Sequence, residues 1–280
     1  MKIGVITDCF KLPLDESIKL AGTLGFSGIQ VYATTGEFSP EVLSAERKAE
    51  LKALLKENNL EISALCGDMG GHGFEIAKDN PDRVEKTKRI IDLAAEFNVP
   101  VITTHIGVIP ADKETDTYKA MLSALNECGA YAVEKEITLA IETGPENAKT
   151  LLAFLEDTTG GVGVNLDPAN FVMVTGQDPV EAVNMLGKYI VHTHAKDGRM
   201  LKKTDPKIIY NHFAEGGIEA LNVADYFIET PLGAGDVDFD AYIDALKNAG
   251  FDGYLTIERE TGADPIGDIK IAKAAIEKML

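Results

Sequence analysis

Four residues with metal-ligating side chains stand at the ends of consecutive β-branched segments in the second half of the chain. They are Glu142, Asp167, His194 and Glu258. Three carboxylates confined with one imidazole repel one another and are costly to bury, and a divalent cation relieves both effects. Carboxylate oxygens with a single histidine suit Mn²⁺ best, and such a site also accepts Mg²⁺, Co²⁺, Fe²⁺ or Zn²⁺. The pattern therefore predicts a divalent-metal site, with manganese as the expected cofactor.

These side chains can meet only if the segments that carry them are neighbouring strands. β-Branched runs occur at residues 2–8, 27–32, 60–66, 99–105, 137–142, 161–167, 189–195 and 253–258. Helical spacing occurs at 14–24, 41–58, 81–97, 115–135, 147–157, 178–187, 238–249 and 265–279. Eight strands alternating with eight helices predict an α/β fold, a (β/α)8 TIM barrel forming a single domain over residues 1–280. The alternative, a doubly wound sheet, would require a GxGxxG pattern after the first strand, where the chain reads Thr7-Asp8-Cys9-Phe10-Lys11.

The alternation of side chains along the predicted strands supplies a second argument. In a barrel every other residue points into the lumen, and active sites form at the C-terminal ends of the strands. The predicted register directs the following residues inward on strands five to eight: Thr138, Ala140 and Glu142; Gly163, Asn165 and Asp167; Ile190, His192 and His194; Tyr254, Thr256 and Glu258. A slip of one residue would turn these side chains outward, so the predicted site depends on this register.

At these residues the sequence resembles the xylose-isomerase-like barrels of the sugar phosphate isomerase/epimerase superfamily. The resemblance rests on the segments Leu139-Ala140-Ile141-Glu142, Val164-Asn165-Leu166-Asp167-Pro168-Ala169-Asn170, His192-Thr193-His194-Ala195-Lys196-Asp197, Pro231-Leu232-Gly233-Ala234-Gly235-Asp236-Val237-Asp238-Phe239 and Leu255-Thr256-Ile257-Glu258. It implies that Glu142, Asp167, His194 and Glu258 are the metal ligands, and that Glu142 and Glu258 are the acid–base pair. The expected function is a metal-dependent sugar isomerase or epimerase that converts a ketose or keto-sugar through an enediolate.

One position departs from that family pattern. Ketose 3-epimerases of the group place a histidine three residues after the ligand aspartate, and this chain has Asn170 there. Asparagine hydrogen-bonds a sugar hydroxyl but does not titrate. The departure leaves open a metal-dependent lyase or dehydratase acting on a keto-inositol or a 3-keto-glycoside. A non-catalytic sugar-binding barrel is a more remote alternative.

Several further polar residues are expected around the substrate. Their common feature is a position at or just after a strand end: Cys66, His105, Glu146, Asn170, Lys196 and Arg199. His105 could instead be a hydrogen-bonded core residue, and Glu146 a helix-start charge that favours the helix dipole. Lys196 and Arg199 could instead pair with Asp197 or lie on the surface. The long segment 198–235 is expected to hold a short helix near 205–215.

Composition excludes several classes of partner. The chain has 280 residues, with 27 basic and 45 acidic side chains and a net charge of −18. A nucleic-acid or anionic-membrane surface requires a basic face, so neither partner is expected, and the related endonuclease IV activity is disfavoured for the same reason. With three cysteines and no recognisable signal sequence, we expect a cytoplasmic protein. The expected partner is a small-molecule sugar or sugar derivative, and family analogy suggests a homo-oligomer.

Overall fold

A computed structural model describes residues 1–218 and 221–280, and within them eight parallel strands close into a barrel. The order around the barrel is β1-β10-β7-β6-β5-β4-β3-β2. The strands are β1 (Lys2–Ile6), β2 (Gly28–Tyr32), β3 (Glu61–Cys66), β4 (Val101–Thr104), β5 (Thr138–Glu142), β6 (Val162–Leu166), β7 (Ile190–Ala195) and β10 (Tyr254–Ile257). The predicted (β/α)8 TIM barrel is therefore confirmed.

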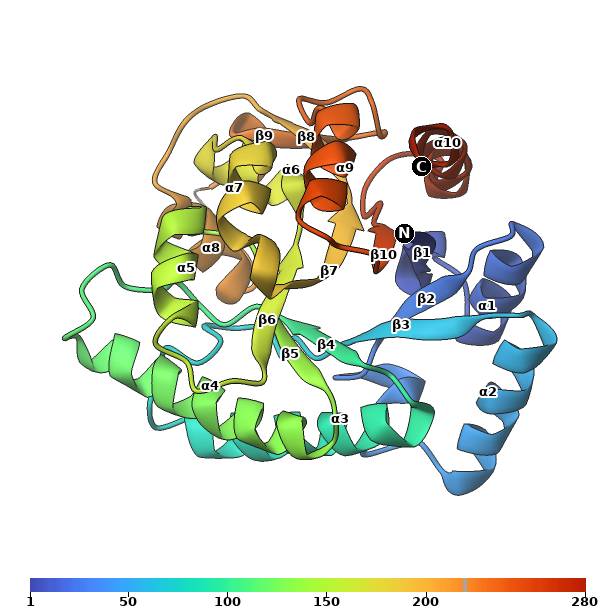
Figure 1. The fold of residues 1–280 in the computed structure, drawn as a ribbon, viewed down its shortest axis with the longest axis horizontal. Helices are drawn as coiled ribbons and strands as arrows, with labels where there is room; N and C mark the ends of the chain where they lie inside the picture. Colours follow the sequence, from blue (N-terminus) through green and yellow to red (C-terminus); the bar gives the residue numbers. More distant parts are fainter. Residues whose placement is uncertain (219–220) are drawn as a thin grey trace.

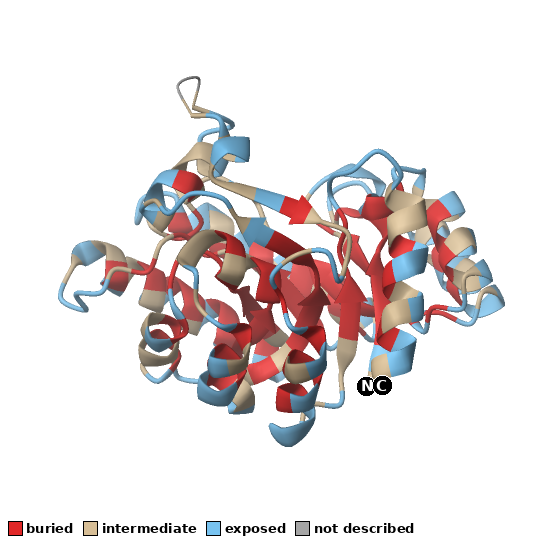
Figure 2. Cartoon of the chain, turned by 90° about the horizontal axis from the view of Figure 1, so that it is seen from above, coloured by how far each residue is buried: buried red, intermediate tan, exposed pale blue. Residues whose placement is uncertain are grey.

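Helices pack around the outside of this barrel (Figure 1). They are α1 (Leu14–Thr23), α2 (Ala45–Glu57), α3 (Asn80–Phe97), α4 (Asp116–Glu134), α5 (Ala148–Leu155), α7 (Pro179–Leu186), α9 (Phe239–Asn248) and α10 (Pro265–Met279). Figure 2 shows buried strands in the interior and helices whose outer sides are exposed. One predicted helix start is wrong. α2 begins at Ala45 instead of residue 41, because the Ser44 side chain caps it by accepting a hydrogen bond from the Arg47 backbone N–H.

The predicted inward and outward faces hold on β5 and β6. Leu139, Ile141, Val164 and Leu166 are fully buried in the large hydrophobic cluster that contains the helix-facing residues. On β7 one assignment is wrong. Ile190 joins that same outer cluster, and Val191 packs against a small second cluster of Ala64, Val101 and Ala140. The cause is a bulge, since Val164 pairs with Ile190 while the next residue, Asn165, pairs with His192.

The segment after β7 carries elements outside the barrel repeat. β8 (Asp197–Met200) and β9 (Phe227–Thr230) form a two-stranded antiparallel sheet. Between them lie α8 (Pro206–Ala214), which confirms the short helix expected near 205–215, and the 3-10 turn Val223–Asp225. The rest of that expected segment includes residues 219–220, which lie outside the described residues. Asp197 fixes the returning chain, because its carboxylate accepts hydrogen bonds from the backbone N–H groups of Gly233, Gly235 and Val237.

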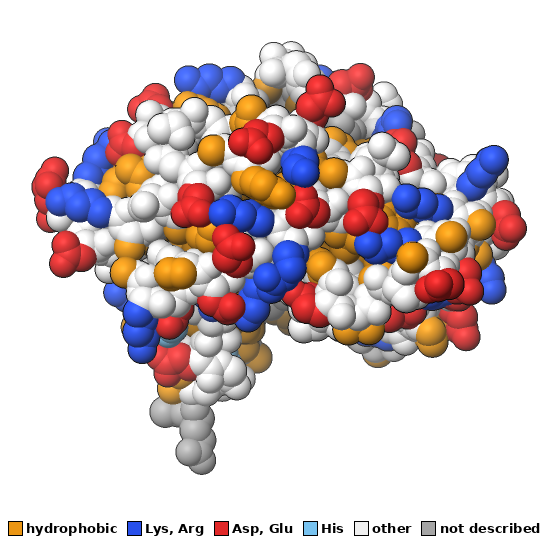
Figure 3. Space-filling view, turned by 90° about the horizontal axis from the view of Figure 1, so that it is seen from below, with side chains coloured by type: hydrophobic (Ala, Val, Ile, Leu, Met, Phe, Trp, Pro, Cys, Tyr) orange, Lys and Arg blue, Asp and Glu red, His pale blue; other side chains and the backbone are white. Residues whose placement is uncertain are grey.

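Two further features bear on partners. Within the described part of the chain, no helix combines the length and apolar character needed to cross a membrane. On the face seen in Figure 3, lysine and arginine side chains are interspersed with aspartate and glutamate. Among the described residues, this face therefore carries no continuous basic patch.

Candidate metal centre and active-site cavity

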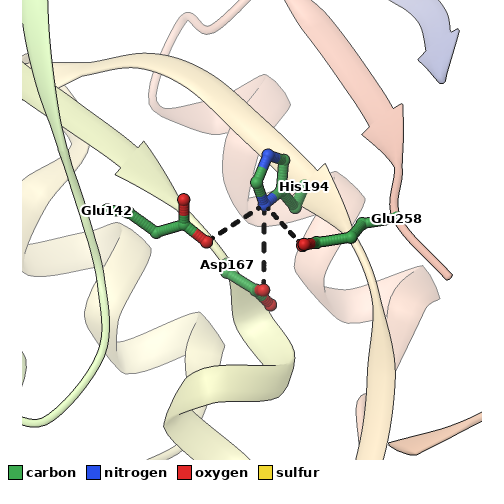
Figure 4. A group of neighbouring side chains, drawn as sticks. All are labelled: Glu142, Asp167, His194 and Glu258. Carbon is green, nitrogen blue, oxygen red and sulfur yellow. Dashed lines mark ion pairs between the residues drawn. The ribbon is translucent and has the colours of Figure 1, made fainter. Parts of the chain in front are cut away.

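The four residues singled out in the sequence meet at one end of the barrel. Each offers one ligand atom, these atoms all lie within 4.8 Å of one another, and all four residues are buried. The Nδ1 atom of His194 lies 2.9 Å from Glu258 Oε2, 3.3 Å from Glu142 Oε1 and 3.8 Å from Asp167 Oδ2. Glu142 and Glu258 approach the imidazole from opposite sides, with Asp167 between them (Figure 4). The strand ends thus gather three carboxylates around one ring nitrogen.

The donor atoms of this cluster fit a divalent cation. His194 Nδ1, Asp167 Oδ2 and Glu258 Oε2 are buried and close together, but none of them forms a hydrogen bond of acceptable geometry with the described residues. Buried polar atoms are normally satisfied, so three such atoms at one point call for a group that binds them all. Ligands about 2.1 Å from a common Mg²⁺ or Mn²⁺ ion stand about 3 Å apart when adjacent, which matches the shorter separations here. The residues present are therefore suited to hold such an ion.

Asp167 is oriented by the turn that follows β6. Its Oδ1 atom accepts hydrogen bonds from the backbone N–H groups of Ala169, at 2.8 Å, and Asn170, at 3.3 Å, and so caps the short helix α6 (Pro168–Asn170). The other oxygen, Oδ2, is thereby directed into the cluster. Asn170 is tied to the same turn, because its side-chain amide donates to the Thr143 carbonyl at 2.8 Å. Asn170 also lines the cavity above the cluster.

His194 is oriented from behind by a residue that the sequence reasoning missed. Gln30 Oε1, on β2, lies 3.0 Å from His194 Nε2. An amide oxygen only accepts, so Nε2 carries the proton and Nδ1 is left for a metal. Gln30 in turn donates to Thr103 Oγ1 at 3.0 Å. The available signal was an amide side chain inside the otherwise apolar, buried strand Gly28–Tyr32.

A second line of hydrogen bonds supports Glu142. The Asn165 amide donates to Glu142 Oε2 at 3.2 Å, and its oxygen lies 2.9 Å from His192 Nδ1. His192 Nε2 lies 3.0 Å from the Thr256 hydroxyl. These contacts place the proton of His192 on Nδ1. Burial lowers the pKa of His192 well below its ordinary value. A neutral, fixed imidazole thus lies beneath the cluster.

Charge in the cluster is strongly coupled. Burial alone would lower the pKa of His194, but Glu258 and Glu142 raise that pKa well above its ordinary value. Burial alone would raise the pKa of the Glu258 carboxyl, but Lys196 and His194 hold it below its ordinary value. Lys196 is itself buried, with its Nζ 2.6 Å from Glu260 Oε2 and 3.4 Å from Glu258 Oε2. One cation therefore links the candidate acid–base residue Glu258 to its neighbour Glu260.

A cavity of about 690 Å³ opens above the cluster. Its polar lining includes Glu142, His194, Lys196, Glu258 and His105. Its size falls in the ordinary range for small-molecule sites. A second cavity of about 480 Å³ adjoins it, and both are lined by Tyr32, Glu258 and Glu260.

His105 and Asp68 form a pair on the cavity wall. Nδ1 of His105 lies 3.0 Å from Asp68 Oδ2, and both residues line the cavity. Burial alone would lower the pKa of His105, but Glu142 and Asp68 raise it to about 10. Because Asp68 engages Nδ1, Nε2 is the nitrogen left for a ligand. Sequence reasoning singled out His105 and missed Asp68, which lies in the glycine-rich loop after β3.

The other expected substrate residues lie at different distances from the cluster. Cys66, at the end of β3, lines the cavity, and burial raises the pKa of its thiol. Glu146 is buried just beyond the cavity residue Pro145, and burial raises the pKa of its carboxyl to about 7. Arg199 is not brought to the cluster. It lies exposed on β8, where it pairs with Asp236 at 3.1 Å and donates to the Ala234 carbonyl.

Comparison with protein families agrees with this geometry. The family model described as Xylose isomerase-like TIM barrel matches residues 18–279. A relative named Uncharacterized protein YfiH, from Bacillus subtilis, is 23% identical over 93% of this chain and 93% of its own. An inosose dehydratase of Clostridium perfringens is 25% identical, over 52% of this chain and 48% of the relative.

Solved structures share the fold over almost the whole chain. A Xylose isomerase domain protein from Planctomyces limnophilus has a TM-score of 0.80 at 24% identity and covers 99% of this chain and 96% of its own. The probable 3-DHS dehydratase AsbF from Bacillus anthracis has a TM-score of 0.77 at 20% identity, covering 99% of both chains. A D-tagatose 3-epimerase-like protein has a TM-score of 0.73 at 20% identity, covering 100% and 98%. The fold therefore occurs among proteins described as dehydratases and as epimerase-like.

Proposed function

The chain belongs to the xylose isomerase-like TIM barrel family, and from this premise we propose that it is a divalent-metal-dependent sugar isomerase or epimerase. The proposed substrate is a ketose or keto-sugar that reacts through an enediolate. The observation that carries the proposal is the set of unpartnered buried ligand atoms of Asp167, His194 and Glu258 at the base of a cavity.

In the proposed site Glu142, Asp167, His194 and Glu258 hold the ion, and Mn²⁺ is our first choice on donor chemistry. When bound, a divalent cation supplies positive charge that stabilises the enediolate formed from the substrate. Gln30 keeps the His194 proton on Nε2, and Asn165 holds the Glu142 carboxylate. The chain's own residues thereby preorganise the site before any substrate arrives.

Glu142 and Glu258 are the proposed acid–base pair. They approach the centre from opposite sides, so a carbon held between them presents one face to each carboxylate (Figure 4). One glutamate removes the proton from the carbon next to the carbonyl, and the other returns a proton to the opposite face. Lys196, beside Glu258, favours the carboxylate form that is needed to accept the proton.

A second candidate function is a metal-dependent lyase or dehydratase of a keto-inositol or 3-keto-glycoside. The observation in its favour is the pair of His105 and Asp68 on the cavity wall. A protonated His105 can donate from Nε2 to an oxygen that leaves the carbon next to the enediolate, which is the additional step that elimination requires. Relatives described as dehydratases support the same candidate.

Proton NMR in D₂O tests both candidates. Protein loaded with Mn²⁺ is incubated with ketoses, their phosphates, inososes and 3-keto-glucosides, and each reaction is quenched and freed of metal before its spectrum is recorded. We expect solvent deuterium at one carbon, abolished by a chelator. An exchanged substrate or its epimer supports the isomerase or epimerase, and an unsaturated product supports the lyase. The matched control is Lys203→Met, an exposed substitution outside the cavity lining. Metal binding without exchange on any of these substrates would contradict both.

A further inference from the structure

The active-site cavity has two ends of different chemistry. One end contains the candidate metal ligands with Lys196 and His105. Another part of the lining comes from the π-helical turn Phe171–Thr175, from α8 and from β9, and apart from Tyr210 and Glu229 it is aliphatic and aromatic. We call this surface the apolar wall, and its members are Met173, Val174, Ile209, Phe213, Phe227 and Ile228. A polyol alone matches the polar end best, because its hydroxyl groups gain little from contact with hydrocarbon side chains.

The apolar wall presents hydrocarbon to the cavity in the ligand-free protein. Phe213 is 59% exposed and Ile228 is 49% exposed, whereas Ile209 and Met173, which line the same cavity, are buried. An arrangement of large exposed side chains on a buried apolar base is typical of a binding surface. Because these residues line the same cavity as Glu142 and His194, a ligand bound at the metal centre can reach them without leaving the cavity.

Hydrogen bonds fix the apolar wall relative to the reacting end. The Tyr210 hydroxyl, on α8, donates to the Gly71 carbonyl in the loop after β3 at 3.1 Å. On β9, Glu229 accepts from Arg259 at 2.6 Å and from the Glu260 backbone N–H at 3.0 Å. Arg259 directly follows Glu258, so β9 is joined to the strand end that carries the candidate acid–base residue. The distance between the two ends of the cavity is therefore set by the fold.

From this continuity we propose that the substrate is a keto-sugar bearing an apolar substituent, an alkyl or aryl aglycone that lies against the apolar wall. The inference rests on the proposed function for the sugar part of the substrate. It adds the chemical class of the group that lies against the apolar wall. Burial of hydrocarbon strengthens binding about fourfold for each methylene removed from water. A phenyl group is therefore expected to improve affinity at least tenfold over a methyl group on the same sugar.

Binding is measured first, independently of catalysis. Calorimetry compares methyl β-glucoside with phenyl β-glucoside on metal-loaded protein, and we expect the phenyl compound to bind at least tenfold more tightly. Phe213→Ser and Ile228→Ser should each weaken the binding of phenyl glucoside more than that of methyl glucoside, and so reduce this preference. The matched control is Ile271→Ser on α10, since Ile271 is also 59% exposed but lies outside the cavity lining. Equal affinity for the two glucosides would overturn the proposal.

Two further measurements distinguish failure of this proposal from failure of the proposed function and from self-association of the chain. Deuterium exchange on methyl and phenyl 3-keto-glucosides tests the reaction, so a phenyl preference in binding without exchange on any keto-sugar would contradict the proposed function and support the apolar wall as a ligand site. Sedimentation of the wild type and Phe213→Ser tests the competing occupant, a second copy of the chain. If Phe213→Ser converts an oligomer into a monomer, and the wild type and the variant show the same phenyl preference, the apolar wall is a subunit interface and the proposal is wrong.

Discussion

Gln30 Oε1 accepts a hydrogen bond from His194 Nε2 at 3.0 Å, although 164 residues separate the two in the chain. This contact decides which ring nitrogen of His194 faces the three carboxylates. Partners behind a metal-binding histidine orient the ring and set its tautomer. Gln30 is therefore a positioning residue of the proposed metal centre, and it reaches His194 from a strand that contributes no ligand.

Gln30→Met is expected to weaken metal binding about 10–100-fold, because it keeps the side-chain length but removes the acceptor. Calorimetric titration with Mn²⁺ measures the affinity. Thr87→Val is the control, since Thr87 is also buried but lies on α3, where its hydroxyl donates to the Arg83 carbonyl away from the cluster. Unchanged Mn²⁺ affinity in Gln30→Met would show that the amide does not set the tautomer.

Glu142→Gln and Glu258→Gln are each expected to lower the rate of solvent deuterium incorporation by about 10²–10⁴-fold, since an amide cannot act as the base. Metal content must be measured in parallel, because both residues are also proposed ligands. Variants that retain the ion and still exchange at the wild-type rate would remove the two glutamates from the acid–base role.

His105→Asn separates the two candidate functions. If the reaction is an elimination, we expect proton exchange to persist while the rate of product formation falls by about 10²-fold. Proton removal needs the glutamates, whereas departure of the leaving group needs His105 as the acid. A substrate with a better leaving group should restore much of the lost rate. Asp68→Asn should have a smaller effect in the same direction, since it leaves the imidazole in place. Equal loss of exchange and product in His105→Asn would instead assign His105 to substrate orientation.

Glu146 predicts a pH dependence of stability. Its pKa rises from 4.5 to about 7 on folding, because burial disfavours the charged form. The folded protein therefore binds more protons than the unfolded chain between these values, and stability falls as pH rises through this window. The loss is on the order of 3 kcal/mol at pH 8.

Urea unfolding of Glu146→Gln at pH 5 and pH 8 measures this contribution. The variant keeps a neutral side chain at both pH values, so its stability relative to the wild type should rise toward pH 8. Glu57→Gln, at an exposed position, controls for the loss of one negative charge. A constant difference between Glu146→Gln and the wild type at the two pH values would mean that the buried carboxyl is not protonated at pH 5.

The sequence by itself determined the barrel and the identity of the clustered residues. Alternating strand and helix patterns follow from local chemistry, and parallel strands in a closed barrel bring their C-terminal ends together whatever the loops do. For that reason the sequence pattern alone groups Glu142, Asp167, His194 and Glu258. Gln30, the partner of His194, and Asp68, the partner of His105, could not be identified in this way, because each hydrogen bond joins segments that are far apart in the chain.

The tertiary structure decided the details that depend on packing between distant segments. The bulge in β7 turned Ile190 outward, and no local pattern marks a bulge whose cause lies in pairing with β6. Lys196 pairs with Glu260 across the site instead of with its neighbour Asp197, whose carboxylate binds backbone N–H groups from residues 233–237. The apolar wall likewise depends on where α8 and β9 fold back over the barrel. Such contacts join residues far apart in the chain, so only the folded chain specifies them.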